Sequence, residues 1–134
     1  MSAAAVQLEE SALAWRDVCA LDDILPDTGV AALVDGRQIA LVRVGAGAEV
    51  YALDNFDPFS RAFVIARGIV GDRQGVPKIA SPIFKQSFDL GTGQCLDDPA
   101  VRLASYQVRV AAGRVMLAAA SLVATPSEAA TGNP

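Results

Sequence analysis

The chain has 134 residues, of which 52% are hydrophobic, and this is enough for one globular domain with a buried core. Its net charge of −4 disfavours contact with a phosphate backbone, so we expect no nucleic-acid partner. The N-terminus lacks the basic and apolar run of a secretory signal, and the uncharged stretch Val115–Ser127 is too short for a membrane helix. These features predict a cytoplasmic protein without membrane association.

The two ends of the chain differ in composition from the middle. Residues 1–13 are rich in alanine, and residues 119–134 are small, polar and interrupted by proline. Such segments bury little apolar surface, so we expect a flexible N-terminal extension, a folded domain at 14–118 and a flexible C-terminal tail. Two cysteines, Cys19 and Cys95, fit no metal or redox spacing. A disulfide between them stays a possible alternative, but without an export signal two reduced thiols are favoured.

The first half of the domain predicts short antiparallel strands. Trp15–Cys19 alternates like a strand, and "LDDILPDTG" then forms a brief turn. Val30–Val34 and Arg37–Val44 are β-prone runs joined by Asp-Gly, which supplies the positive φ of a tight hairpin. After the turn "GAGA", residues 49–54 return as a third strand. A three-stranded meander is therefore predicted.

The second half predicts more loop. Residues 54–78 show no periodic segment, and "RGIVGDRQGVPK" is rich in glycine, so we expect a loop with at most a short turn of helix. Short strands follow in "KIAS" and "SFDL", with a glycine turn and a strand restart in "GTGQC". "YQVRV" and "RVMLA" form a last hairpin, with Val108 and Val110 opposite Val115 and Leu117. The prediction is an all-β antiparallel sandwich or barrel with long Pro- and Gly-rich loops.

Catalytic motifs are weak in this sequence. The chain has no histidine, which removes the commonest general base and any Ser-His or Cys-His pair. The acidic pairs at 22–23 and 97–98 lie in turn-rich segments, where aspartate usually caps backbone amides. The glycines of residues 68–75 lack the Gly-Lys-Ser/Thr ending of a phosphate loop. No acid–base, nucleophilic or nucleotide site is indicated.

Charge and aromatic residues are concentrated in one window of the chain, from Pro58 to Phe88. It has five cations and one anion, a balance of +4, whereas the rest has six cations and fourteen anions, a balance of −8. All five phenylalanines lie in or beside this window. Two interpretations have similar weight: the aromatics anchor long loops to the core, or aromatic and basic side chains form a docking surface.

Two proline loops, "DNFDPFSRA" and "ASPIFKQSFDLGTG", together with the preceding meander, resemble the Rieske [2Fe–2S] fold over about residues 15–118. The tail of that pattern is matched by Phe88–Leu90, Thr92, Gly93, Leu96, Pro99 and Tyr106–Val110. In the Rieske family each loop carries one cysteine and one histidine ligand. Here the corresponding positions hold Asp57 and Phe59 in the first loop and Ser81 and Phe84 in the second. The resemblance therefore implies the fold but no metal, cofactor or catalytic residue in this chain.

One branch of the Rieske family has lost its ligands in this way, the small subunit of assimilatory NAD(P)H-dependent nitrite reductase. The chain resembles that branch in Asp-Pro-Phe, in "ARGIVGD" and in Ser-Pro-x-x-Lys-Gln. The resemblance implies a non-catalytic subunit that binds and supports a large subunit. That partner is expected to carry FAD, an iron–sulfur cluster and sirohaem, and to reduce nitrite to ammonium in nitrate assimilation.

The resemblance also gives the loop residues expected roles. Phe59 and Phe84 fill the space of the cluster, each contributing about 2 kcal/mol if buried, and Asp57 and Ser81 hydrogen-bond within the loops. The expected partner-binding candidates are Phe59, Arg61, Arg67, Arg73, Lys78 and Lys85. The alternatives are a free-standing electron carrier, a module that binds a small molecule or cation through Asp57 and Ser81, and a cofactor-free enzyme that uses the carboxylates.

Overall fold

The structure, a computed structural model, describes residues 14–119 and Leu122. The predicted N-terminal extension and nearly all of the predicted C-terminal tail lie outside the described residues. No helix of the described part is long and apolar enough to span a membrane.

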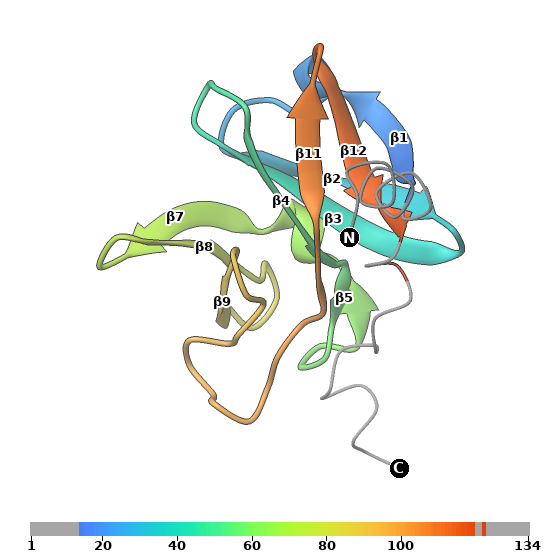
Figure 1. Cartoon of the computed structure of the whole chain (residues 1–134). Coiled ribbons are helices and arrows are strands. Elements are labelled where there is room, and N and C mark those ends of the chain that lie inside the picture. Colours follow the sequence, from blue (N-terminus) through green and yellow to red (C-terminus); the bar gives the residue numbers. More distant parts are fainter. Residues whose placement is uncertain (1–13, 120–121, 123–134) are drawn as a thin grey trace, which may run out of the picture.

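The described residues form short strands and two turns of 3-10 helix, with no α-helix among them. The elements are β1 (Trp15–Ala20), η1 (Leu21–Asp23), β2 (Thr28–Val34), β3 (Arg37–Val44), β4 (Glu49–Asp54), β5 (Phe56–Asp57), β6 (Ala62–Phe63), η2 (Ile65–Arg67), β7 (Ile69–Arg73), β8 (Val76–Ala80), β9 (Ser87–Asp89), β10 (Ser105–Tyr106), β11 (Val108–Ala111) and β12 (Arg114–Ala118). The predicted all-β class is confirmed (Figure 1).

The predicted meander forms the central sheet, which has the order β10-β4-β3-β2. Its first hairpin turns at Asp35 and Gly36, whose φ angles of 49° and 81° are those that a tight two-residue turn requires. A second sheet, β1-β12-β11, contains the predicted C-terminal hairpin. In it Val108 pairs with Leu117 and Val110 with Val115, as the period-2 pattern predicts. In Figure 1 this second sheet lies at the top of the view, above β2–β4.

The structure of the segment after residue 68 differs from the sequence prediction. It was expected to be a loop, but β7 and β8 form a regular hairpin that continues into β9. The hairpin turns at Gln74 and Gly75, with φ angles of 54° and 87°. Pro77 is tolerated because it lies opposite Asp72, in a position whose amide is not needed for pairing with β7. The signal was hidden because most side chains of β7 are exposed, so no apolar alternation marks it.

Two smaller features expected in this half differ from the structure. The short turn of helix allowed within residues 67–78 is not found there, and a 3-10 turn, η2 at Ile65–Arg67, ends at the first of them. The strand restart in "GTGQC" is absent, because residues 91–95 contribute only isolated bridges, from Gln94 to Arg102 and from Cys95 to Phe88.

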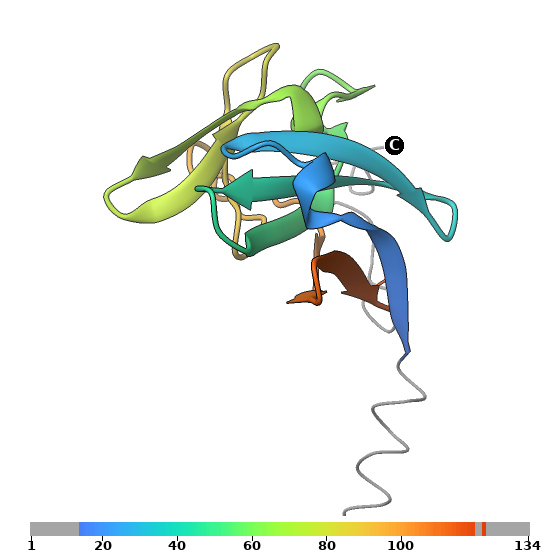
Figure 2. The ribbon, with the colours of Figure 1, turned by 90° about the horizontal axis from the view of Figure 1, so that it is seen from above.

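The core consists of two hydrophobic clusters on opposite faces of the central sheet. Ala40 and Val42 of β3 belong to the cluster that packs against β8, β9 and η2. Ile39 and Leu41 alternate with them and pack toward β1, β11 and β12. All four side chains are fully buried, so β3 is covered on both faces. Figure 2, seen from above, shows the central sheet between β7–β9 and β11–β12.

Candidate functional site

The two proline loops have the same backbone geometry. In the first proline loop (residues 57–61) the Arg61 amide donates to the Asp57 carbonyl at 2.7 Å, and the Phe59 amide donates to the Asp57 carboxylate at 2.9 Å. In the second (residues 81–85) the Lys85 amide donates to the Ser81 carbonyl at 3.1 Å, and the Ile83 amide approaches the Ser81 hydroxyl at 3.3 Å. Asp57 and Ser81 therefore begin equivalent turns and use their side chains to cap them.

A direct side-chain contact joins the two loops. The Ser81 hydroxyl donates to Oδ2 of Asp57 at 2.5 Å, and both residues are buried. The same carboxylate oxygen accepts the Ser60 hydroxyl at 2.9 Å. With the Phe59 amide, three donors satisfy the Asp57 carboxylate, as a buried charge requires. The predicted hydrogen-bonding role of Asp57 and Ser81 is confirmed, and the bond runs between the loops as well as within them.

The two loop phenylalanines behave differently. Phe59 is partly buried and packs on the core, with its ring centroid 6.2 Å from that of Phe88. Phe84 is 57% exposed, so the expectation that it fills the space between the loops is wrong. The two turns have the same length, but Phe84 lies three residues after Ser81, whereas Phe59 lies two residues after Asp57. Ile83, not Phe84, therefore occupies the position equivalent to Phe59.

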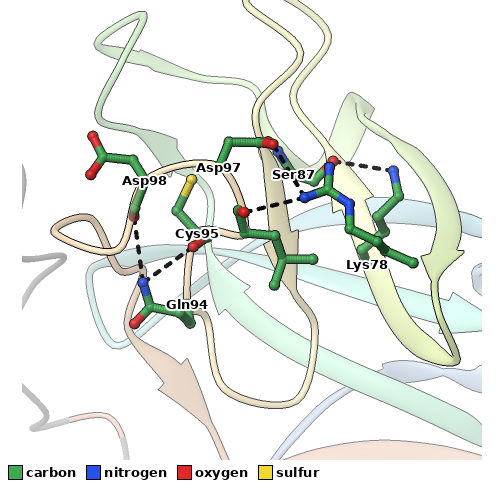
Figure 3. Close-up of polar contacts among 8 residues, drawn as sticks. Lys78, Ser87, Gln94, Cys95, Asp97 and Asp98 are labelled. Carbon is green, nitrogen blue, oxygen red and sulfur yellow. Dashed lines mark hydrogen bonds and ion pairs between the residues drawn. The ribbon is translucent and has the colours of Figure 1, made fainter.

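Two of the five candidate cations have structural partners within the domain. Arg73 forms an ion pair with Asp97 at 3.2 Å and donates to the Leu96 carbonyl. Lys78 donates to the Ser87 hydroxyl at 3.1 Å, a contact drawn in Figure 3. The Arg73 contacts hold the segment after β9 against β7, and the Lys78 contact links β8 to β9. The other three, Arg61, Arg67 and Lys85, are exposed, and their side chains have no hydrogen bond or ion pair with another described residue.

Gln94 organises the segment between β9 and β10, a role that the sequence analysis missed. The two N–H groups of its Nε2 are shared among the carbonyls of Cys95, Pro99 and Val101, at 3.0–3.2 Å, and that of Asp98, at 3.5 Å. Figure 3 shows this amide between Cys95 and Asp98. A lone glutamine after a glycine turn carries no sequence signal for such a role, because its partners are backbone atoms brought together only by folding.

Three of the four aspartates in the acidic pairs have the capping roles that their turn-rich segments predict. Asp23 accepts the Ala20 amide at 3.0 Å, and Asp98 accepts the Ala100 amide at 3.0 Å. Asp97 accepts the Ser87 amide at 2.7 Å (Figure 3). This bond, followed by the Arg73 guanidinium, lowers the pKa of the Asp97 carboxyl below its usual value. No group of three metal-ligating side chains occurs among the described residues.

Both cysteines are free thiols, as favoured from the sequence. Cys19 packs against the cluster shared with β1, β11 and β12, whereas Cys95 is buried in the other cluster. Burial raises the pKa of both thiols, and at Cys19 the nearby Asp23 carboxylate adds to the effect. Neither lies in a proline loop, so neither supplies a ligand at the former Rieske positions.

Comparison with known proteins identifies the family to which this pair of loops belongs. A family model for the Rieske-like [2Fe–2S] domain matches residues 14–118. The chain belongs to the Rieske-like domain family. Within that family it is 42% identical over 103 residues to the nitrite reductase (NADH) small subunit of Escherichia coli K12, covering 77% of this chain and 95% of that protein.

Further relatives place the chain in the nitrite reductase small-subunit branch of the family. The solution structure of the nitrite reductase [NAD(P)H] small subunit from Erwinia carotovora superposes with a TM-score of 0.69 at 48% identity, covering 78% of this chain and 80% of that one. The chain is also 39% identical over 110 residues to the nitrite reductase [NAD(P)H] large subunit of Klebsiella oxytoca, matching 82% of this chain and 11% of that protein.

The residues at the former ligand positions do not fit a Rieske cluster. The cluster needs two cysteine thiolates and two imidazoles, and this chain has no histidine at all. At the two cysteine positions the Asp57 and Ser81 side chains bond each other at 2.5 Å. At one histidine position Phe59 packs on the core, and at the other Phe84 faces outward. These side chains do not offer an iron–sulfur cluster the donor atoms that it needs.

Proposed function

We propose that the chain is the non-catalytic small subunit of an NAD(P)H-dependent nitrite reductase and holds no redox centre of its own. The Asp57–Ser81 bond carries the proposal, because it closes the loops at the two positions where a Rieske protein binds iron. The loops that hold a cofactor in the family would then serve as a rigid structural element.

The partner in this proposal is the large subunit, which carries FAD, an iron–sulfur cluster and sirohaem and reduces nitrite to ammonium in nitrate assimilation. Support comes from the Klebsiella oxytoca protein, a large subunit in which 11% of the length matches this chain. One polypeptide there combines a domain like this one with the remainder of a large subunit. A separate chain of the same kind would bind its large subunit without covalent linkage, in the cytoplasm and without nucleic acid or membrane.

Co-purification tests the proposal directly. The tagged chain is expressed with the large subunit encoded in the same host, isolated, and analysed for bound iron and for its visible spectrum. We expect a coloured complex that has NAD(P)H-dependent nitrite reduction, and a colourless, iron-free small chain after the two are separated. Iron and visible absorbance that stay with the isolated small chain would contradict the cluster-free assignment. Failure to recover any large subunit would contradict the assignment of the partner.

A further inference from the structure

Arg61 and Lys85 occupy equivalent places in the two proline loops. Each lies four residues after the residue that begins its turn, and each donates its amide to that residue's carbonyl. Each has a left-handed backbone, with φ angles of 60° and 69°. Glycine adopts this conformation without a steric penalty, whereas a residue with a Cβ does not. The chain has a cation at both places.

The fold itself gives no reason for these two cations. Both are exposed, and neither side chain makes a hydrogen bond or ion pair with another described residue. A positive φ alone marks no site, since Gln74 of the β7–β8 turn and Ala112 share it. The distinguishing features are the equivalence of the two loops, the shared charge and the side chains around them.

The surface around the two loops is apolar and basic. Of the six large hydrophobic side chains that are exposed in the described residues, four are Phe63, Ile69, Ile83 and Phe84. Three contacts bring their segments together: the Asp57–Ser81 bond, the pairing of Ile69 with Ala80, and the packing of Phe63 on Phe56 at 5.1 Å between ring centroids. We call these four residues, with Arg61, Arg67 and Lys85, the loop-end surface.

The charges of the loop-end surface have one sign. Across residues 55–71 and 80–88 the only carboxylate is that of Asp57, which is fully buried. The exposed charges are therefore those of Arg61, Arg67 and Lys85, in a chain whose net charge is −4. A partner complementary to this surface has an apolar patch with carboxylates at its rim.

We infer that the loop-end surface is the docking face for the large subunit, with Phe84 inserted into an apolar patch and Arg61 and Lys85 paired with acidic side chains around it. This rests on the proposed function, since the partner is the one named there. It goes further by excluding Arg73 and Lys78, whose partners lie within the domain, and by making Phe84 an apolar anchor outside the core.

The backbone of the two loops allows a test that separates effects on folding stability from effects on binding affinity. In the Arg61→Gly/Lys85→Gly variant the carbonyl–amide bonds of both turns stay in place and the left-handed strain is removed. We expect its melting temperature to stay unchanged or to rise, by up to about 5 °C for each substitution. We expect its affinity for the purified large subunit to fall by about tenfold at low salt, with the difference shrinking as salt screens the charges.

Three further variants complete the design. Phe84→Ala is expected to bind more weakly at every salt concentration, because its contribution is apolar. Gln74→Gly relieves the same backbone strain at an exposed turn outside the loop-end surface, and Arg109→Gln removes a cation from β11. Both are expected to bind like the wild-type chain. Unchanged affinity of either the double variant or Phe84→Ala would overturn the inference, and so would equal losses in the two controls. Wild-type chain that does not bind the large subunit would instead overturn the proposed function.

Discussion

At the scale of single residues, the most informative pair is Asp57 and Ser81. A buried carboxylate is unfavourable unless donors surround it, and here every donor to Asp57 comes from the proline loops themselves. Where the family binds iron, the chain joins the loops with one charged hydrogen bond. The bond stabilises the loop conformation without a metal and leaves the outer side chains free for contact with another protein.

The first prediction concerns this bond. Ser81→Ala removes the buried donor and leaves Asp57 with one fewer partner, so we expect the free energy of unfolding to fall by about 1.5–3 kcal/mol. Urea unfolding at neutral pH measures the change. Ser60→Ala is the matched control, because it removes a second hydroxyl from the same oxygen at a less buried position, and its effect should be smaller. A double-mutant cycle that combines Asp57→Ala with Ser81→Ala should show coupling between the two residues. A cycle without coupling would contradict this account.

At the scale of elements, close backbone contacts position the loops. Gly68 joins η2 to β7, and a Cβ at this residue would lie 2.3 Å from the Ala80 carbonyl oxygen. The contact fixes η2 beside the strand that leads into the second proline loop. The first loop precedes η2 in the chain, so the approach at Gly68 helps to bring Asp57 within reach of Ser81.

The second prediction tests that approach. Gly68→Ala requires the backbone of β8 or η2 to move, and we expect a loss of about 2–4 kcal/mol in stability. Gly47→Ala is the control, because a Cβ there meets nothing within 4 Å and the backbone is not left-handed. Its effect should stay within about 0.5 kcal/mol. Thermal unfolding of the two variants compares them, and similar losses would contradict the contact-based explanation.

The third prediction concerns the attachment of the segment after β9 to the sheet β7-β8-β9. The Ser87 amide and the Arg73 guanidinium lower the pKa of Asp97 below 3.8, so its carboxylate is favoured in the folded state. A lowered folded pKa contributes stability that is complete above the unfolded pKa and is lost as the pH falls through the folded pKa. Asp97→Asn should therefore be less stable than the wild-type chain from neutral pH to about pH 4, with the difference shrinking below that.

Urea unfolding of both chains between about pH 3 and pH 7 measures the effect. Arg73→Gln serves as the companion variant, because it removes the ion-pair partner and keeps the Ser87 amide. It should reduce the acid dependence only in part, since the amide is the larger cause of the shift. A difference between wild type and Asp97→Asn that is the same at both ends of the range would contradict the assignment.

At the scale of the whole molecule, β3 connects two separate hydrophobic clusters. Its four central side chains alternate between them and are all fully buried. Each cluster contains one cysteine, and the central sheet lies between Cys19 and Cys95. The fold is therefore held by packing on two faces of one sheet and needs neither a disulfide nor a metal ligand from these residues.

The fourth prediction follows from this arrangement. Because both thiols are free, a reducing agent should leave the melting temperature unchanged. A thiol reagent at neutral pH should label Cys19 faster than Cys95, which is only 2% exposed, and denaturant should make the two react alike. In Cys19→Ser, labelling should then require unfolding. Rapid labelling of that variant in the native state would show that the cluster around Cys95 opens.

Elements that depend on local chemistry could be predicted from the amino-acid sequence. The Asp35–Gly36 turn, the alternation of Val108 and Val110 with Val115 and Leu117, and the capping aspartates follow from short stretches of residues. The four residues at the former ligand positions could also be identified before the structure, through the resemblance of the two loops to the Rieske family. The hairpin β7–β8 could not be predicted, because its exposed side chains and its glycines hide the strand pattern.

The roles of the two proline loops follow from contacts in the folded molecule and could not be predicted from the sequence. Three outcomes depend on contacts between distant segments. Ser81 reaches Asp57, Phe59 packs inward while Phe84 is exposed, and Arg73 and Lys78 are paired within the domain. Residue type allows either outcome at each of these positions, because a phenylalanine can fill a core or cover a surface and a cation can pair inside or outside. Burial and pairing are properties of neighbours in space, and these neighbours come together only when the sheet β7-β8-β9 packs on the central sheet.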